Sequence, residues 1–201
     1  MLRKLLPSCR LQPSLLPGVT AGLLLTASSG VWAHAAAGGD GWLHPLTGSD
    51  HMVAMVAVGA WSTQLGGRAL WAVPGAFLLF MLIGGLVGFE LVDVPYVETG
   101  VALSVLLLGA AIMLHGRVPL WGATTAVALF GLCHGYLHGY EMPIAEHRVL
   151  NTLGFLGTTA ALHVLGLLLG WTTERLPKGQ ALLRLSGAAS TLFGLWLVAA
   201  S

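Results

Sequence analysis

The chain has 201 residues, of which 56% are hydrophobic and only 8% are charged. Soluble globular domains carry about 25% charged residues, so this composition excludes an ordinary soluble domain and predicts an all-α, polytopic transmembrane helical bundle. The net charge of +1 gives no sign of nucleic-acid binding, and two cysteines are too few for a disulfide framework.

The first 33 residues have the order of a secretory signal peptide. Basic residues at positions 3, 4 and 10 precede an apolar stretch over residues 19–27, and Val31 and Ala33 offer small or modest side chains at the positions that select a cleavage site. Cleavage after Ala33 would make His34 the first residue of a mature domain, residues 34–201, on the outer side of the membrane. An uncleaved first span is the alternative, because Pro17 and Gly18 interrupt the leader.

Six apolar runs of about the length that crosses a bilayer follow the leader. They cover residues 45–64, 69–90, 98–115, 119–140, 149–171 and 181–199. Because the connections are short, we expect a single bundle in the lipid bilayer and no separate soluble domain. Three spans in each half would allow an inverted repeat, although the residue identities do not demonstrate one.

Charged residues are distributed unevenly between the connections. If the mature amino terminus lies outside, six spans return the carboxyl terminus to the same side, so we expect both termini in the periplasm of a bacterial inner-membrane protein. Most basic residues then fall on the cytoplasmic side, as the positive-inside rule predicts: Arg68, Arg117, Arg175, Lys178 and Arg184. Every carboxylate except Glu174 falls on the outer side, where it would attract cations.

The first span begins with a short motif that runs from His44 to His51 and also contains Asp50. Proline suits the first turn of a helix, so a helix that starts at Pro45 would put the two histidines about two turns apart on one face. Asp50 alone would also serve as a helix cap, but a cap explains neither histidine.

The fourth span ends with His134, His138 and Glu141, whose spacing of four and three residues places them on one helical face. This is metal-ligand spacing. Glycines at positions 131, 135 and 139 form a neighbouring ridge against which another helix can pack closely. The alternative is a helix-packing motif whose histidines bond to the backbone. Ionisable groups buried in a membrane are costly, and their clustering favours a functional site.

Both motifs reach the outer ends of their spans, so the first and fourth spans can assemble one metal site. Its candidate ligands are His44, Asp50, His51, His134, His138 and Glu141. Imidazole and carboxylate ligands suit nickel, cobalt, zinc or iron(II), and spacing does not choose among them. His34, with a free amine after cleavage, is a further candidate. His163 shares a face of the fifth span with Thr152 and Thr159 and would either continue a metal path inward or serve in packing.

At these two motifs the sequence resembles the HupE/UreJ family of nickel and cobalt permeases, which is associated with hydrogenase and urease gene clusters. The family pattern His-Pro-x-x-Gly-x-Asp-His is matched in full from His44 to His51. The pattern Phe-His-Gly-x-Ala-His-Gly-x-Glu is matched except at Cys133 and Leu137, which replace the phenylalanine and the alanine. The resemblance implies nickel as the transported metal, cobalt next, no prosthetic group, and metalloenzyme maturation proteins as partners.

These observations predict a transport protein, not an enzyme, that takes up nickel by facilitated diffusion or secondary transport, since the sequence has no phosphate-binding loop for ATP. One alternative is an intramembrane zinc-dependent hydrolase, because a His-x-x-x-His pair near a carboxylate can hold zinc and activate water. Another is a metal sensor or maturation partner that docks through the short loops. Metal flux across a membrane would separate the transporter from both.

Overall fold

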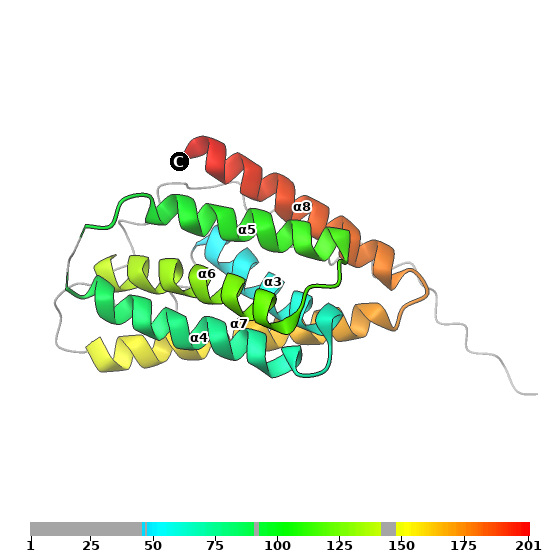
Figure 1. Cartoon of the computed structure of the whole chain (residues 1–201), viewed down its shortest axis with the longest axis horizontal. Coiled ribbons are helices and arrows are strands. Elements are labelled where there is room, and N and C mark those ends of the chain that lie inside the picture. The colour runs from blue at the N-terminus through cyan, green and yellow to red at the C-terminus, as the bar shows by residue number, and fades with distance from the viewer. Residues whose placement is uncertain (1–45, 47, 91–92, 142–147) are drawn as a thin grey trace, which may run out of the picture. The chain divides into compact units, whose positions relative to one another are not determined.

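The computed structural model describes residues 46, 48–90, 93–141 and 148–201, and in these ranges the chain forms helices and no strand. The all-helical fold predicted from the sequence is therefore confirmed. The helices are α3 (Ser49–Leu65), α4 (Ala69–Gly88), α5 (Val97–Leu114), α6 (Leu120–Glu141), α7 (Arg148–Glu174) and α8 (Gly179–Ala200) (Figure 1).

Five of these helices, α4 to α8, are long and apolar enough to cross a membrane. The chain is therefore a multi-pass membrane protein. The remaining helix, α3, has 17 residues, and the start predicted for it at Pro45 lies outside the described residues. The count of six spans stays a prediction. The predicted signal peptide over residues 1–33 also lies outside the described residues.

The helices form three closely packed pairs, α4 with α6, α3 with α7, and α5 with α8. Glycine makes each pair possible, because the two backbones meet where a side chain would stand. A Cβ atom placed on Gly135 of α6 would lie 1.9 Å from the carbonyl oxygen of Met81 in α4. A Cβ on Gly59 of α3 would lie 2.1 Å from the carbonyl oxygen of His163 in α7, and one on Gly194 of α8 would lie 2.4 Å from a nitrogen in α5. The predicted glycine ridge on the fourth span is thus confirmed as a packing surface, and its partner is α4.

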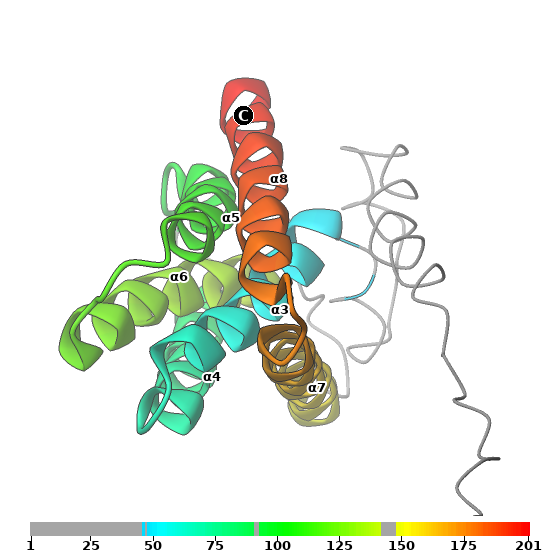
Figure 2. The ribbon, with the colours of Figure 1, turned by 90° about the vertical axis from the view of Figure 1, so that its right-hand side faces the viewer.

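Helix α3 runs through the interior of the bundle, where it packs against α4, α5, α7 and α8 (Figure 2). From Ala54 to Thr63 nearly every one of its residues is buried. A helix that is covered on all sides positions its first turn, and with it His51, against side chains from several neighbours.

The pairing has an internal regularity. If α3, α4 and α5 are exchanged for α6, α7 and α8 in order, the pair α3–α7 becomes α6–α4, and the pair α5–α8 is unchanged. With three helices in each half, the second half would start from the opposite side of the membrane, so these three closest pairs follow the exchange that an inverted repeat would give, whereas the α3–α5 contact has no counterpart of similar extent between α6 and α8. Residue identity alone did not reveal this relation.

Charged residues separate between the two ends of the described bundle. The connections that follow α3, α5 and α7 lie at one end, and the connection that follows α4 lies at the other (Figure 1). The first end carries Arg68, Arg117, Arg175 and Lys178 beside the single carboxylate of Glu174, whereas the terminal turns at the second end carry Asp50, Glu98 and Glu141 beside Arg148. Three of the predicted outer carboxylates therefore lie at the end of the bundle that also carries His51 and His138.

Candidate metal centre

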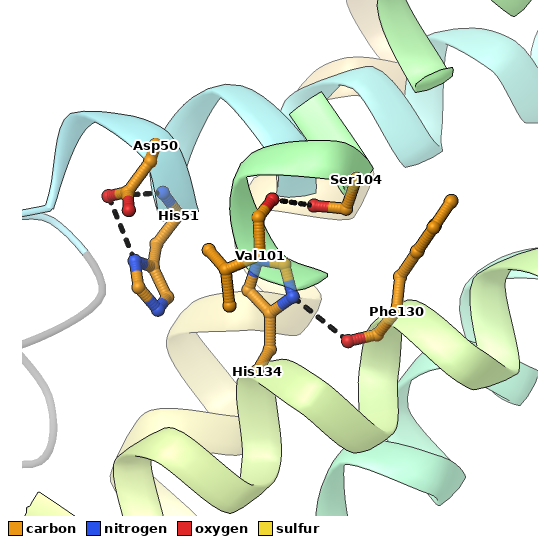
Figure 3. A network of polar contacts seen from close by, with 6 residues as sticks. All are labelled: Asp50, His51, Val101, Ser104, Phe130 and His134. Atoms are coloured by element: carbon orange, nitrogen blue, oxygen red, sulfur yellow. Dashed lines mark hydrogen bonds and ion pairs between the residues drawn. The ribbon is translucent and has the colours of Figure 1, made fainter. Parts of the chain in front are cut away.

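The first turn of α3 holds Asp50 and His51 in a pair of hydrogen bonds (Figure 3). The backbone N–H of His51 and its ring Nδ1–H both donate to Asp50 Oδ1, each over 2.9 Å. An ionised carboxylate can only accept, so a ring proton lies on Nδ1, and in the neutral imidazole that binds metal the lone pair lies on Nε2. Metal-binding histidines are commonly oriented in this way, by a carboxylate on the other ring nitrogen.

Gly48, which precedes α3, leaves the space that this pair needs. A Cβ atom on Gly48 would lie 3.0 Å from Asp50 Oδ1 and 3.0 Å from His51 Nδ1. Any side chain at this position would press on both partners of the hydrogen bond. Steric space around the Asp50–His51 pair therefore explains why glycine occupies position 48 of the first histidine motif, which the spacing of the motif did not explain.

The second half of α6 contributes His134 and His138, and both imidazoles are buried, with 0% and 4% exposure. His134 Nδ1–H donates to the carbonyl oxygen of Phe130, one turn earlier, over 2.9 Å (Figure 3). Since a carbonyl can only accept, the lone pair of His134 lies on Nε2, which has no hydrogen-bond partner in the part of the chain that the structure describes.

Three of the predicted residues meet inside the bundle. The ring centroid of His51 lies 4.9 Å from that of His134 and 4.6 Å from that of His138. The three imidazoles, which we name the outer cluster, come from α3 and α6, the two helices that carry the motifs. Among the described residues, however, no three His, Cys, Asp or Glu side chains stand close enough to hold a metal ion as they are. A bound ion would require the rings to turn toward it.

The other predicted residues have different positions. Glu141 is the last residue of α6, one turn beyond His138, and is half-buried. His44 and His34 lie outside the described residues. His163 is buried on α7, and its ring lies 5.1 Å from that of Phe77.

Two phenylalanines that sequence reasoning missed border the outer cluster. Phe155 of α7 lies edge-on to His138, with ring centroids 4.5 Å apart. Phe77 of α4 stands between two histidines, 5.3 Å from the ring of His134 and 5.1 Å from that of His163. Phe155 could have been found from the sequence, because it lies eight residues before His163 and so on the same side of that helix. Nothing in the apolar run of α4 distinguished Phe77.

Comparison with known proteins gives a consistent result. A model of the family described as HupE / UreJ protein matches residues 22–197 of the chain. Protein HupE of Rhizobium leguminosarum bv. viciae is 41% identical over 171 residues, which cover 83% of this chain and 88% of that protein. No solved structure matches the chain.

Proposed function

The chain belongs to the HupE/UreJ family, and from this premise we propose that it carries nickel ions, with cobalt as a second substrate, across the bacterial inner membrane into the cytoplasm. The observation that carries the proposal is the meeting of His51, His134 and His138 inside a membrane bundle. The transported metal would supply hydrogenase or urease maturation.

The chemistry of the outer cluster suits a divalent first-row metal. Hydrogen bonds from Nδ1 to Asp50 and to the carbonyl of Phe130 orient the rings of His51 and His134, so each would coordinate a metal ion through Nε2. Imidazole nitrogen is a good ligand for nickel and cobalt. The two oriented rings, those of His51 and His134, come from different helices. Polar groups are expensive inside a bilayer, so several buried imidazoles in contact are better explained by binding than by packing.

The arrangement also suits transport better than storage. A transported ion must bind tightly enough to enter the site but weakly enough to leave it, so the protein should supply only part of the ion's coordination shell. In the outer cluster the rings must turn to converge on an ion, and waters would complete its coordination. We propose that Asp50, Glu141 and the histidine at position 44 join the three imidazoles during capture, and that flux is passive or coupled to another ion. Both termini would lie in the periplasm, with the carboxylate-rich end of the bundle facing the same side.

The test is uptake of radioactive nickel by cells that express the protein, with flux in liposomes as a second measurement across nickel, cobalt, zinc and iron(II). We expect His51→Ala and His138→Ala to abolish uptake. His115→Asn is the matched control, because it removes a histidine at the opposite end of the bundle and asparagine tolerates the left-handed backbone found there. Uptake at the wild-type level in both cluster variants would refute the assignment.

A further inference from the structure

One face of α7 carries a line of buried residues that the outer cluster does not use. Phe155, Thr159 and His163 follow each other at intervals of four residues, so they share one side of the helix. Phe155 contacts His138 in the outer cluster, and His163 contacts Phe77. This face therefore leads from the outer cluster toward the middle of the bundle.

Two polar residues of this face, Thr159 and His163, are buried without a hydrogen-bond partner in the described part of the chain. Thr159 is 0% exposed and His163 is 2% exposed, yet neither Thr159 Oγ1 nor either ring nitrogen of His163 has a hydrogen-bond partner among the described residues. Leaving buried polar groups unpaired costs free energy, especially in a membrane, where water does not compensate.

Other polar side chains in these helices solve the same problem locally. The hydroxyls of Thr152 and Thr172, also on α7, donate to carbonyls four residues earlier, and the fully buried Ser62 does the same on α3. The ring of His134 donates to its own helix as well. Thr159 and His163 have the same option and do not take it, which sets them apart from side chains that serve only in packing.

Helix geometry gives the depth of this pair. His163 lies eight residues beyond Phe155, so it is about 12 Å further along the axis than the level of His138. It also lies ~22 Å from the start of α7 and ~16 Å from its end, which places it near the middle of a bilayer core of about 30 Å. The close contact between His163 and Gly59 fixes this position against α3.

We propose that Thr159 and His163 form an inner station, a second and weaker site for a divalent metal ion on its way from the outer cluster to the cytoplasm. One imidazole nitrogen and one hydroxyl oxygen would bind the ion, and water molecules would fill its other positions. So few protein ligands allow rapid exchange, which conduction requires. The inner station rests on the proposed transport function for its role, although its capacity to bind metal does not.

The first test compares Thr159→Val with Thr152→Val in liposomes loaded with purified protein. Valine matches the shape of threonine and removes only the hydroxyl. We expect Thr159→Val to lower nickel flux about 10-fold, as loss of a metal-supporting group typically does, without lowering the melting temperature, because no hydrogen bond is lost. Thr152→Val removes a satisfied hydroxyl on the same helix, so it should lower the melting temperature slightly and leave flux unchanged.

The second test does not depend on flux. Full-length protein with ¹⁵N-labelled histidine is titrated with Zn²⁺ in detergent micelles, and the ring signal of His163 is assigned by its loss in His163→Gln. We expect the His163 signal to shift at a higher zinc concentration than that of His51. In Thr159→Val the zinc concentration needed for the His163 shift should rise about 10-fold.

The outcomes separate the two proposals. A zinc-dependent shift of His163 in a protein that carries no metal into liposomes would support the inner station and refute the transport function. Metal flux at the wild-type level in Thr159→Val, or a His163 signal that stays constant while the outer cluster saturates, would overturn the inner station. Those last results would leave transport through the outer cluster standing.

Discussion

Gly135→Ala should destabilise the protein by opening the α4–α6 pair. The new Cβ would lie 1.9 Å from the carbonyl oxygen of Met81, whereas ordinary contact begins at 3.4 Å, so the two backbones must part by about 1.5 Å. A gap of 0.5–1 Å already forfeits about a quarter to a half of a dispersion contact, and overpacking typically costs about 1–3 kcal/mol. The higher helix propensity of alanine, worth at most about 1 kcal/mol, offsets only part of this cost. Because His134 precedes Gly135, its ring would also move relative to His51, so uptake should fall.

Gly85→Ala is the matched control, since it makes the same chemical change on the other helix of the same pair. There the nearest atom to the new Cβ is the carbonyl oxygen of Gly135 at 3.5 Å, an ordinary contact. This variant should melt at or above the wild-type temperature and keep its uptake. Thermal unfolding in detergent, followed by the fluorescence of the seven tryptophans, should separate the two variants by on the order of 5 °C. Equal melting temperatures for both variants, or a Gly135→Ala protein as stable as wild type, would refute the steric argument.

Three further predictions follow from single contacts. Asp50→Ala removes the acceptor that orients His51, so the nickel concentration for half-maximal uptake should rise about 10- to 100-fold, and Asp50→Asn, which keeps an acceptor oxygen, should have the smaller effect. Tyr136→Phe removes the hydroxyl that accepts from the backbone N–H of Val94 over 3.0 Å, which should cost about 1 kcal/mol and speed hydrogen exchange at that amide, with uptake retained. Thr63→Val removes a hydroxyl that donates over 3.3 Å both to a carbonyl of its own helix, at Gly59, and to one of α7, at Leu167, so stability should drop by only about 0.6 kcal/mol and uptake should stay within twofold of wild type; a large loss of uptake would show that this hydroxyl has a second role.

The positions of the helices could be predicted from the sequence because charges and turns interrupt the apolar runs. The span expected over residues 69–90 is the helix Ala69–Gly88, and the span expected over residues 149–171 is the helix Arg148–Glu174. The shared face of His134 and His138 follows from helical periodicity in the same way.

The pairing of the helices was not predictable by these means. In a membrane, association depends on where backbones can approach, and hydrophobicity is similar on every face. Glycine at position 135 marked a packing surface but did not identify α4 as its partner. Phe77 could not be recognised for the same reason, because its contacts with His134 and His163 exist only once α4 lies against α6 and near α7.

The helix pairing also gives the proposed metal path a direction. The two ligand helices, α3 and α6, do not form a closely packed pair with each other, because α3 packs against α7 and α6 packs against α4. The α3–α7 pair carries His51, Thr159 and His163, whereas the α4–α6 pair carries Phe77, His134 and His138. An ion in the outer cluster would thus be bound by both pairs, and an ion at the inner station by the α3–α7 pair alone. Passage inward would release the ligands of α6 while the ion stays with the other pair, so a small shift between the two pairs would weaken the first site without disturbing the second.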